Sequence, residues 1–306
     1  MEVRTDHLAT VIGCAATWAS AAEVLVCPKP GLVDPLDRGC HDDMDWTHFL
    51  LSCSALAGFW SEQAKVGLSG IAHGEALEAL RRNGLAMERV MFEATGGVNT
   101  HKGLIFALSL WVYGAGRCAT KGLPMDVSTM GSVAAGPATG LVDRELRPLK
   151  DGTDRRSKLT HGERLYLEHS VTGIRGEAEA GFPTVVNRVY PAVKEWIAKG
   201  ASLNDAALMG LLSAMESCED SNVIHRGGYE FWAGTYKRAV RNAIQEFNPL
   251  SGDHSPLFTL DAKLKEAGVS PGGAADLLAC GLFALMMIDK ELITKANGNI
   301  LTDNIK

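Results

Sequence analysis

Four segments of the chain combine positive charge, carboxylates and glycine within short stretches. Each places a cation beside glycine or Pro-Gly, and each adds carboxylates or an asparagine. Glycine lets a ligand approach the backbone, Lys and Arg suit phosphate oxygens, and carboxylates with Asn suit Mg²⁺, which often bridges to substrate phosphates. The combination predicts a site that holds a polyphosphate through both cations and a metal ion. The segments are CPKPGLVDPLDRGCHDDMD (27–45), TGGVNTHKG (95–103), TGIRGEAEAGFP (172–183) and CEDSNVIHRGG (218–228).

Each of these features also has an ordinary structural interpretation. A Lys-Gly or Arg-Gly pair is typical of a helix C-terminus with a solvated charge. Glu219 and Asp220 are harder to explain in this way, because they follow a predicted helix whose apolar stripe includes Leu208, Leu212 and Met215. Acids at a helix C-terminus oppose the macrodipole at a cost of about 0.3–1 kcal/mol each. We therefore favour a metal or substrate role for this pair.

Helical patterns must position the four segments, because alternating strand patterns are absent from the sequence. Ser202 with Asp205 resembles a capping box, and Ser270-Pro271 is typical of an N-cap followed by proline, starting a helix that runs to about Asp289. The charged stretch Arg147–Lys158 is expected to be a surface loop. We predict a single all-α domain over 1–306, with the active site built from inter-helix loops. Further helices are predicted near 5–26, 46–66, 74–94, 101–118, 126–145, 159–170, 184–199, 229–247 and 257–267.

Composition excludes several classes of partner. The net charge is −6 and the chain has no Lys/Arg run, which argues against nucleic-acid binding. The seven cysteines include no CxxC pair, which favours free thiols in a reducing cytoplasm over structural zinc. The longest apolar runs, Leu104–Gly116 and Leu277–Ile288, fall short of the ~20 residues that span a bilayer. With no convincing targeting segment at MEVRTDH, we expect a soluble, cytoplasmic protein with no membrane partner.

The motifs resemble the triphosphoribosyl-dephospho-CoA synthases over nearly the whole chain. That resemblance implies a transferase that joins the triphosphoribosyl group of ATP to the ribose 2'-hydroxyl of 3'-dephospho-CoA. Adenine leaves, and 2'-(5''-triphosphoribosyl)-3'-dephospho-CoA forms as a prosthetic-group precursor for citrate lyase or malonate decarboxylase, to be passed to a carrier-protein transferase. The sequence leaves the pathway and the oligomeric state open. The matching stretches are PKPGLVD (28–34), GCHDDM (39–44), GVNTHKGLIF (97–106), LVDREL (141–146), TGIRGEAEAGFP (172–183), EDSNVIHRGG (219–228) and SPGGAADLLA (270–279).

The implied reaction assigns roles to the charged residues. Displacing adenine from C1 of ribose passes through an oxocarbenium-like state, so the leaving base needs a proton and the attacking hydroxyl needs a base. Nothing in the spacing separates a carboxylate that binds metal from one that transfers protons. We expect acid–base roles for Glu177 and Glu179; Mg²⁺ at Asp34, Asp43, Glu219 and Asp220; and substrate binding by Lys29, Asn99, His101, Lys102, Arg175, Asn222, His225 and Arg226.

Two other functions fit parts of the sequence. An all-α, metal-dependent phosphohydrolase would use His41-Asp42 as a metal-binding pair, although such pairs normally lie on helices among further histidines. A helical binding module would bind nucleotide without turnover, but it leaves the clustered carboxylates unexplained. The reaction products distinguish these alternatives, because the transferase releases adenine and the hydrolase releases phosphate. The chain has no GxxxxGK[ST] phosphate loop and no kinase signature.

Overall fold

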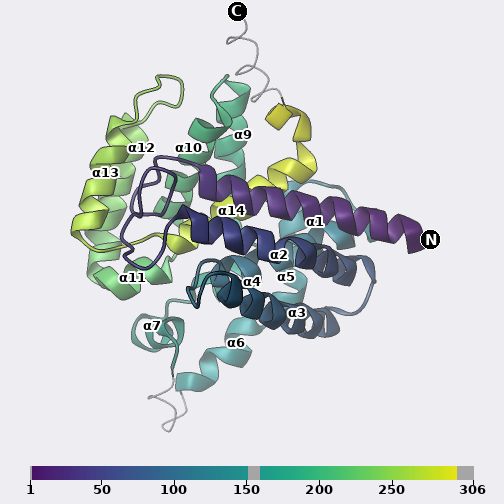
Figure 1. Ribbon diagram of the computed structural model, residues 1–306. Helices are drawn as coiled ribbons and strands as arrows, with labels where there is room; N and C mark the ends of the chain where they lie inside the picture. The colour runs from purple at the N-terminus through teal and green to yellow at the C-terminus, as the bar shows by residue number, and fades with distance from the viewer. Residues whose placement is uncertain (1, 151–158, 295–306) are drawn as a thin grey trace, which may run out of the picture.

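The chain folds as an assembly of helices, as predicted. The computed structural model describes residues 2–150 and 159–294, and within these residues it contains α-helices but no strand (Figure 1). Residues 151–158, the second part of the predicted surface loop, lie outside the described residues. The α-helices are α1 (Glu2–Leu25), α2 (Trp46–Leu68), α3 (His73–Ala94), α4 (Lys102–Lys121), α5 (Val127–Ala138), α6 (Leu141–Glu145), α7 (His161–His169), α8 (Gly173–Glu179), α9 (Tyr190–Ala198), α10 (Leu203–Ser217), α11 (Ser221–Gly227), α12 (Lys237–Glu246), α13 (Ser255–Glu266) and α14 (Gly272–Ile288).

Between residues 2 and 150 and between 159 and 294, three short helical pieces of other types are present. A 3₁₀ turn, η1, covers Arg147–Lys150, and two π-helices, η3 (Val185–Val189) and η4 (Phe231–Tyr236), lead directly into α9 and α12. A π-helix widens the backbone by one residue per turn and is often found at functional sites. The η3 segment also carries polar side chains, those of Asn187 and Arg188.

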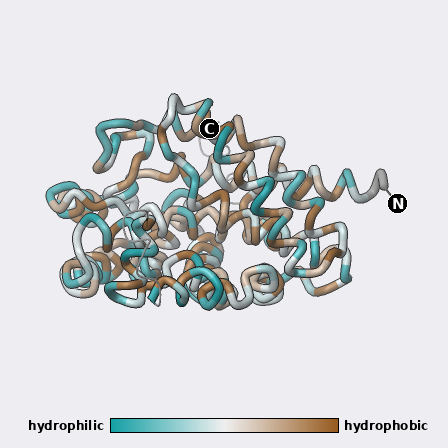
Figure 2. Tube along the Cα trace, turned by 90° about the horizontal axis from the view of Figure 1, so that it is seen from below, coloured by the Kyte–Doolittle hydropathy of each residue, from teal (hydrophilic) through white to brown (hydrophobic). Residues whose placement is uncertain are grey.

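Helix α14 lies at the centre of the packing. It contacts α1, α4, α9, α10 and η3, while α1 and α2 lie side by side (Figure 1). One buried apolar cluster extends from Ala9 to Ile293 and includes Trp60, Trp111 and Phe283, each fully buried. Along the outer helices, hydrophilic and hydrophobic residues alternate as expected for amphipathic helices (Figure 2). The two long apolar runs of the sequence therefore form core helices α4 and α14.

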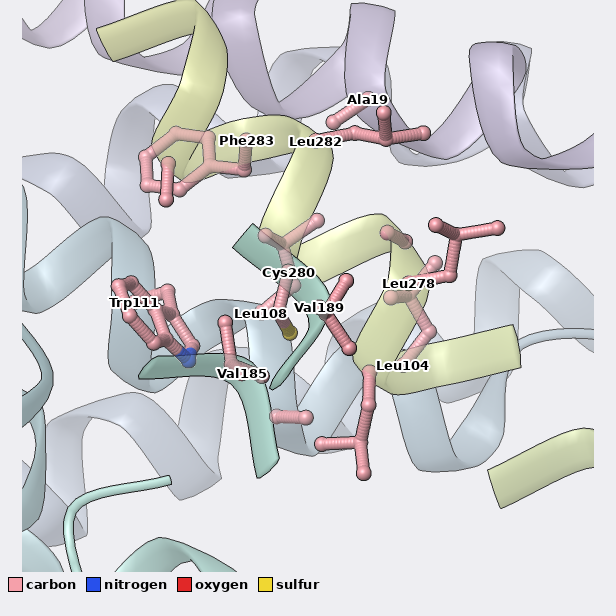
Figure 3. Packing of buried hydrophobic residues seen from close by; sticks show 14 of the residues in the cluster. Ala19, Leu104, Leu108, Trp111, Val185, Val189, Leu278, Cys280, Leu282 and Phe283 are labelled. Carbon is pink, nitrogen blue, oxygen red and sulfur yellow. The ribbon is translucent and has the colours of Figure 1, made fainter. Parts of the chain in front are cut away.

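The apolar face of η3 is packed into this core. Val185 and Val189 are fully buried and lie beside Leu278 and Cys280 of α14 (Figure 3). Asn187 and Arg188 of the same π-helix are exposed and line the cavity described below. The buried valines therefore anchor η3 in the core, and its polar residues face the cavity.

Helix α1 also satisfies the length and composition of a membrane span. The stretch Thr5–Leu25 has a mean hydropathy of 1.5, and half of its most apolar window is buried inside the protein. Its contacts with α2, α4 and α14 are those of a core helix. This packing suggests a helix of a soluble fold.

The structure corrects the sequence prediction in two of the four charged segments. TGIRGEAEAGFP and CEDSNVIHRGG were expected to be loops, but they contain α8 and α11. Helix α11 begins after Asp220, whose carboxylate accepts hydrogen bonds from the amides of Asn222 and Val223. The amides at the start of α8 are instead satisfied from a distant segment, by Glu219. Both helices are too short to show apolar periodicity, so the pattern could not reveal them.

Smaller differences concern helix boundaries. The predicted helix 126–145 is divided into α5 and α6 at Gly140, which has a φ of 70°. Helix α14 begins at Gly272 with Pro271 as its N-cap, one residue later than predicted. The predicted cap of α10 is confirmed, because the Ser202 hydroxyl accepts a hydrogen bond from the amide of Asp205 at 3.0 Å.

Candidate active site

The four charged segments meet at one cavity of about 1060 Å³. Its walls come from the end of α1, the 26–45 loop, the first turns of α2 and α4, helix α8, the η3 segment, the end of α10, helix α11 and the start of α14. Residues that are far apart in the sequence therefore line the same cavity. The charged and histidine residues that line it are Glu23, Lys29, His41, Asp43, His101, Lys102, Glu177, Arg188, Glu216, Glu219, Arg226 and Asp276.

The two predicted acid–base residues lie in different surroundings. Glu177 lines the cavity, and its carboxylate accepts hydrogen bonds from the amide of Thr184 at 2.7 Å and from its hydroxyl at 3.1 Å. Burial raises the pKa of Glu177, the Thr184 bonds lower it, and the negative charge of Glu219 raises it again. Glu179 does not line the cavity. Its two oxygens accept the amides of Gly140 and Val142, at the start of α6, at 2.8 and 2.9 Å.

In the structure, Glu179 therefore binds backbone amides and is not brought to the cavity. It satisfies backbone amides that begin a helix, where negative charge is favourable. The sequence could not distinguish it from Glu177, because the two residues are only two positions apart and share the same glycine-rich surroundings. The tertiary contact between α6 and α8 determines which of them faces the substrate space.

Two of the four predicted metal ligands are also bound to backbone amides and lie outside the cavity lining. Asp34 is 3% exposed and accepts the amides of Lys29, Leu36 and Asp37. It shapes the turn that follows Pro30. Asp220 is 1% exposed and accepts amides from Asn222, Val223 and, across the site, Ala274 at 2.9 Å.

Asp220 corrects the argument from the helix dipole. The acid pair does follow the end of α10, but Asp220 is the N-cap of the next helix, where a carboxylate is stabilising. The C-terminus of α10 is instead capped by Lys237, whose buried ammonium donates to the carbonyl oxygens of Met215 at 3.1 Å and Cys218 at 3.0 Å. Its position there satisfies the last carbonyls of the helix.

This arrangement gives a first prediction. Asp220→Asn should lower the free energy of unfolding by about 1–3 kcal/mol, because an amide group can no longer accept all three backbone N–H groups. Chemical denaturation measures this change. ATP affinity should change equally with and without Mg²⁺. A loss of affinity that appears only with Mg²⁺ would contradict the structural role and restore Asp220 as a metal ligand.

The remaining two predicted metal ligands do face the cavity. Glu219 accepts the amides of Thr172 and Gly173 through one oxygen, at 3.0 and 3.4 Å. Asp43 has a side chain that is 65% exposed and lies 3.7 Å from His41 Nδ1. Among residues 2–150 and 159–294, no three His, Cys, Asp or Glu side chains are arranged to hold a metal ion. A divalent ion at Asp43 or Glu219 would therefore draw further oxygen ligands from its substrate, as Mg²⁺ commonly does.

The predicted cations divide in a similar way. Lys29, Lys102 and Arg226 line the cavity, together with the predicted amides Asn99 and Asn222. Lys29 is 4% exposed and donates to the Glu23 carboxylate at 2.6 Å, so its charge is already compensated.

Two further predicted cations lie outside the lining. Arg175 pairs with Glu145 at 3.0 Å. His225 stacks on His161, with ring centroids 3.6 Å apart. Neither side chain is brought to the substrate space.

His101 faces the cavity but is not a cation. Its ring is 2% exposed, and burial together with the nearby charge of Lys29 lowers its pKa to about 3. Nδ1 lies 2.7 Å from the hydroxyl of Ser52. Nε2 has no hydrogen-bond partner among the described residues. A neutral imidazole can hydrogen-bond to a substrate, but it does not supply the positive charge that the sequence assigned to it.

The His41-Asp42 pair required by the phosphohydrolase alternative is not formed in the cavity. His41 lines it, with Nε2 at 3.1 Å from the Ser270 hydroxyl, whereas Asp42 does not. Burial and the charge of Arg226 lower the pKa of His41. Its acidic neighbour in the structure is Asp43.

Four charged residues of the lining were not singled out by the sequence. They are Glu23, Arg188, Glu216 and Asp276. Asp276 carried a usable signal, since it is the only charged residue between Glu266 and Asp289 in an otherwise apolar helix. Glu23 lies in a similar setting near the end of apolar α1. The sequence contains no comparable signal for Arg188, because the direction of its side chain depends on the π-helical turn of η3.

Fold and cavity together define an all-α protein with a charged site suited to polyphosphate ligands. The family model of ATP:dephospho-CoA triphosphoribosyl transferase matches residues 9–295, and the chain belongs to this family. The resemblance noted in the sequence is thereby confirmed. The match supports the transferase and gives no support to the phosphohydrolase alternative.

Individual relatives agree with the family match. The chain is 37% identical over 283 residues to the "Probable 2-(5''-triphosphoribosyl)-3'-dephosphocoenzyme-A synthase" of Vibrio cholerae, covering 90% of this chain and 88% of the relative. It is 34% identical over 295 residues to the protein of the same name from Malonomonas rubra, covering 95% and 92%. No solved structure matches the chain.

Proposed function

We propose that this chain transfers the triphosphoribosyl group of ATP to the 2'-hydroxyl of 3'-dephospho-CoA and releases adenine. The observation that carries the proposal is the convergence of four charged segments on one cavity of about 1060 Å³, within a chain of this family. ATP brings a triphosphate and dephospho-CoA a diphosphate, so both substrates need positive charge. The reacting sugar carbon also needs carboxylates beside it. The cavity lining contains both kinds of group.

Glu177 is the best candidate for the base that accepts the proton of the attacking hydroxyl. Its carboxylate is oriented by the two Thr184 donors, which favour the ionised form. Burial and Glu219 raise its pKa, which makes the ionised form a stronger base near neutral pH. The same negative charge stabilises the oxocarbenium character that develops at C1.

Two arginines provide uncompensated positive charge. Within the described residues, neither Arg188 nor Arg226 forms an ion pair with a carboxylate, whereas Lys29 is paired with Glu23 and Lys102 with Glu88. Guanidinium groups match phosphate oxygens in a bidentate geometry. Arg188 lies four residues after Thr184, which holds Glu177. We assign the triphosphate of ATP to Arg188, because this places the ribose between the triphosphate and Glu177.

Mg²⁺ is expected to accompany ATP. Asp43 and Glu219 supply carboxylate oxygens at the cavity, and triphosphate oxygens with water would complete the ligand set. When bound, the ion neutralises phosphate charge. Because Asp34 and Asp220 bind backbone amides, Asp43 and Glu219 are the predicted metal ligands that remain available.

We further infer that the protein works in the cytoplasm. The seven cysteines are free thiols, which suits a reducing cytoplasm. The product carries a triphosphoribosyl group. We expect it to pass to a transferase that attaches it to an acyl carrier protein.

Product analysis tests the function directly. The protein incubated with MgATP and dephospho-CoA should release free adenine and form a product with the combined mass of dephospho-CoA and triphosphoribose. ADP, AMP and phosphate should stay at background levels. Detection of phosphate or ADP without adenine would overturn the transferase and support a hydrolase. Nucleotide binding with no turnover would support the binding-module alternative.

A second prediction concerns Arg188. Arg188→Ala should raise the KM for ATP by roughly 10- to 100-fold, the loss expected for hydrogen bonds to a charged group, and should change kcat less. Steady-state kinetics with each substrate varied in turn measures this. Arg238→Ala, an exposed arginine of α12 that does not line the cavity, is the matched control. An increase confined to the KM for dephospho-CoA would contradict the assignment to ATP.

A further inference from the structure

Asp276 is an acid in an unusual place. It lies in the first half of α14, whose neighbouring residues Ala274, Leu277 and Leu278 are buried in the core. Its side chain lines the cavity. An acid at a mostly apolar position costs stability unless it is paired, so a functional reason is expected.

The carboxyl group is held against the first turn of α4. It lies so close to Gly103 that a Cβ there would collide with Oδ2, and the nearby backbone amide of Leu104 favours its charged form. Glycine at this position leaves the space that the carboxyl occupies. Asp276 therefore has a fixed position, set by two core helices rather than by a loop.

Its surroundings favour the protonated form. Burial, the charge of Glu23 and the charge of Asp220 raise the pKa of Asp276 well above its usual range, against the single Leu104 amide that lowers it. Glu177 differs, because it has two hydrogen-bond donors from Thr184. Two carboxyl groups in one cavity with such different surroundings are suited to opposite proton-transfer roles.

We propose that Asp276 is the general acid of the reaction and donates its proton to the departing adenine. This assignment rests on the function proposed above. The glycosidic C1–N9 bond breaks, and its electron pair goes to adenine, which takes a proton from Asp276 at N3 or N7. The bond from C1 to the 2'-oxygen of dephospho-CoA forms, and the hydroxyl proton goes to Glu177. Water then returns a proton to Asp276 and removes one from Glu177.

The other groups of the cavity are less suited to this step. Burial and nearby positive charge lower the pKa of both His101 and His41, which disfavours the imidazolium form that a general acid would use. Glu23 is paired with Lys29, and one Glu219 oxygen is bound by backbone amides. Asp43 has a side chain that is mostly exposed to solvent, and it is one of the two carboxylates assigned above to Mg²⁺.

A change of leaving group tests the assignment. In 7-methyl-ATP the purine already carries a positive charge and leaves without protonation. Asp276→Asn should lower kcat with ATP by ~10²-fold or more, the usual effect of losing one proton transfer. With 7-methyl-ATP the same variant should stay within a few-fold of wild type. Glu177→Gln is the comparator and should lose similar activity with both nucleotides, because the hydroxyl still needs a base.

The possible results separate the hypotheses. An equal loss with both nucleotides would overturn the general-acid role and leave Asp276 a positioning residue, and unchanged activity with ATP would also overturn it. If wild type does not use 7-methyl-ATP, 8-aza-ATP, whose base is a better leaving group, serves in the same comparison. Melting temperature and ATP binding of Asp276→Asn should remain near wild type, which excludes misfolding. If wild type itself releases no adenine, the proposed function fails.

Discussion

Glu177→Gln should lower kcat by about 10²- to 10⁴-fold while the KM for ATP changes little. Gln keeps the size and one acceptor oxygen, so the bond from the Thr184 amide can persist. It cannot accept the hydroxyl proton, and it removes the negative charge beside the reacting carbon. Because that charge acts mainly in the transition state, the loss should fall on kcat. Steady-state adenine release measures both constants.

Glu179→Gln is the matched control for this experiment. It makes the same chemical change two residues away, at a carboxylate that binds the amides of Gly140 and Val142. It should lower the melting temperature and leave kcat near wild type. If Glu177→Gln retained a normal kcat while Glu179→Gln lost it, the assignment made from the structure would be reversed.

The helical framework could be predicted because it depends on local patterns. Long apolar stripes and caps such as Ser202 locate α10, and the uncharged runs locate α4 and α14. Short helices are different, because their stability comes from contacts far away in the sequence. Helix α8 begins where Glu219 binds its first amides, and Glu219 is more than forty residues away. No local pattern in TGIRGEAEAGFP carries that information.

The location of the site was predictable, but the roles within it were not. The residue composition of the four charged segments predicted that they form a site, and they do meet at one cavity. Each role then depends on what a side chain contacts. Asp34 and Asp220 are held by backbone amides, Lys29 by Glu23, and His101 is neutral because it is buried. Residue type and spacing do not contain these contacts.

A glycine can be required for two different structural reasons, a positive φ or space for a neighbouring group, and the sequence does not distinguish them. Gly39, with a φ of 58°, allows the 26–45 loop to turn where a Cβ would strike the backbone of Leu32. Gly103 has helical geometry and no need of a positive φ. Its lack of a side chain leaves room for a carboxyl group from another helix. Gly39 therefore permits a backbone turn, and Gly103 permits the carboxyl group of Asp276 to occupy its position.

Gly103→Ala should therefore lower kcat by about 10²-fold, comparable to loss of the general acid. The added methyl group occupies the space of Asp276 Oδ2 and displaces the carboxyl from its position. Gly74→Ala is a close control, because Gly74 is likewise the second residue of its helix and a Cβ there meets no atom within 4 Å. Alanine favours helix over glycine by up to about 1 kcal/mol, so this control should keep kcat and gain slightly in melting temperature.

A double variant distinguishes displacement of Asp276 from simple blocking of the cavity. Gly103 itself lines the cavity, so its methyl group could also obstruct a substrate. If Gly103→Ala acts through Asp276, it should lower kcat little further in an Asp276→Asn background, because residues that act as one unit have non-additive effects. Fully additive losses, or a rise in the KM for ATP in place of the fall in kcat, would show that obstruction is the cause.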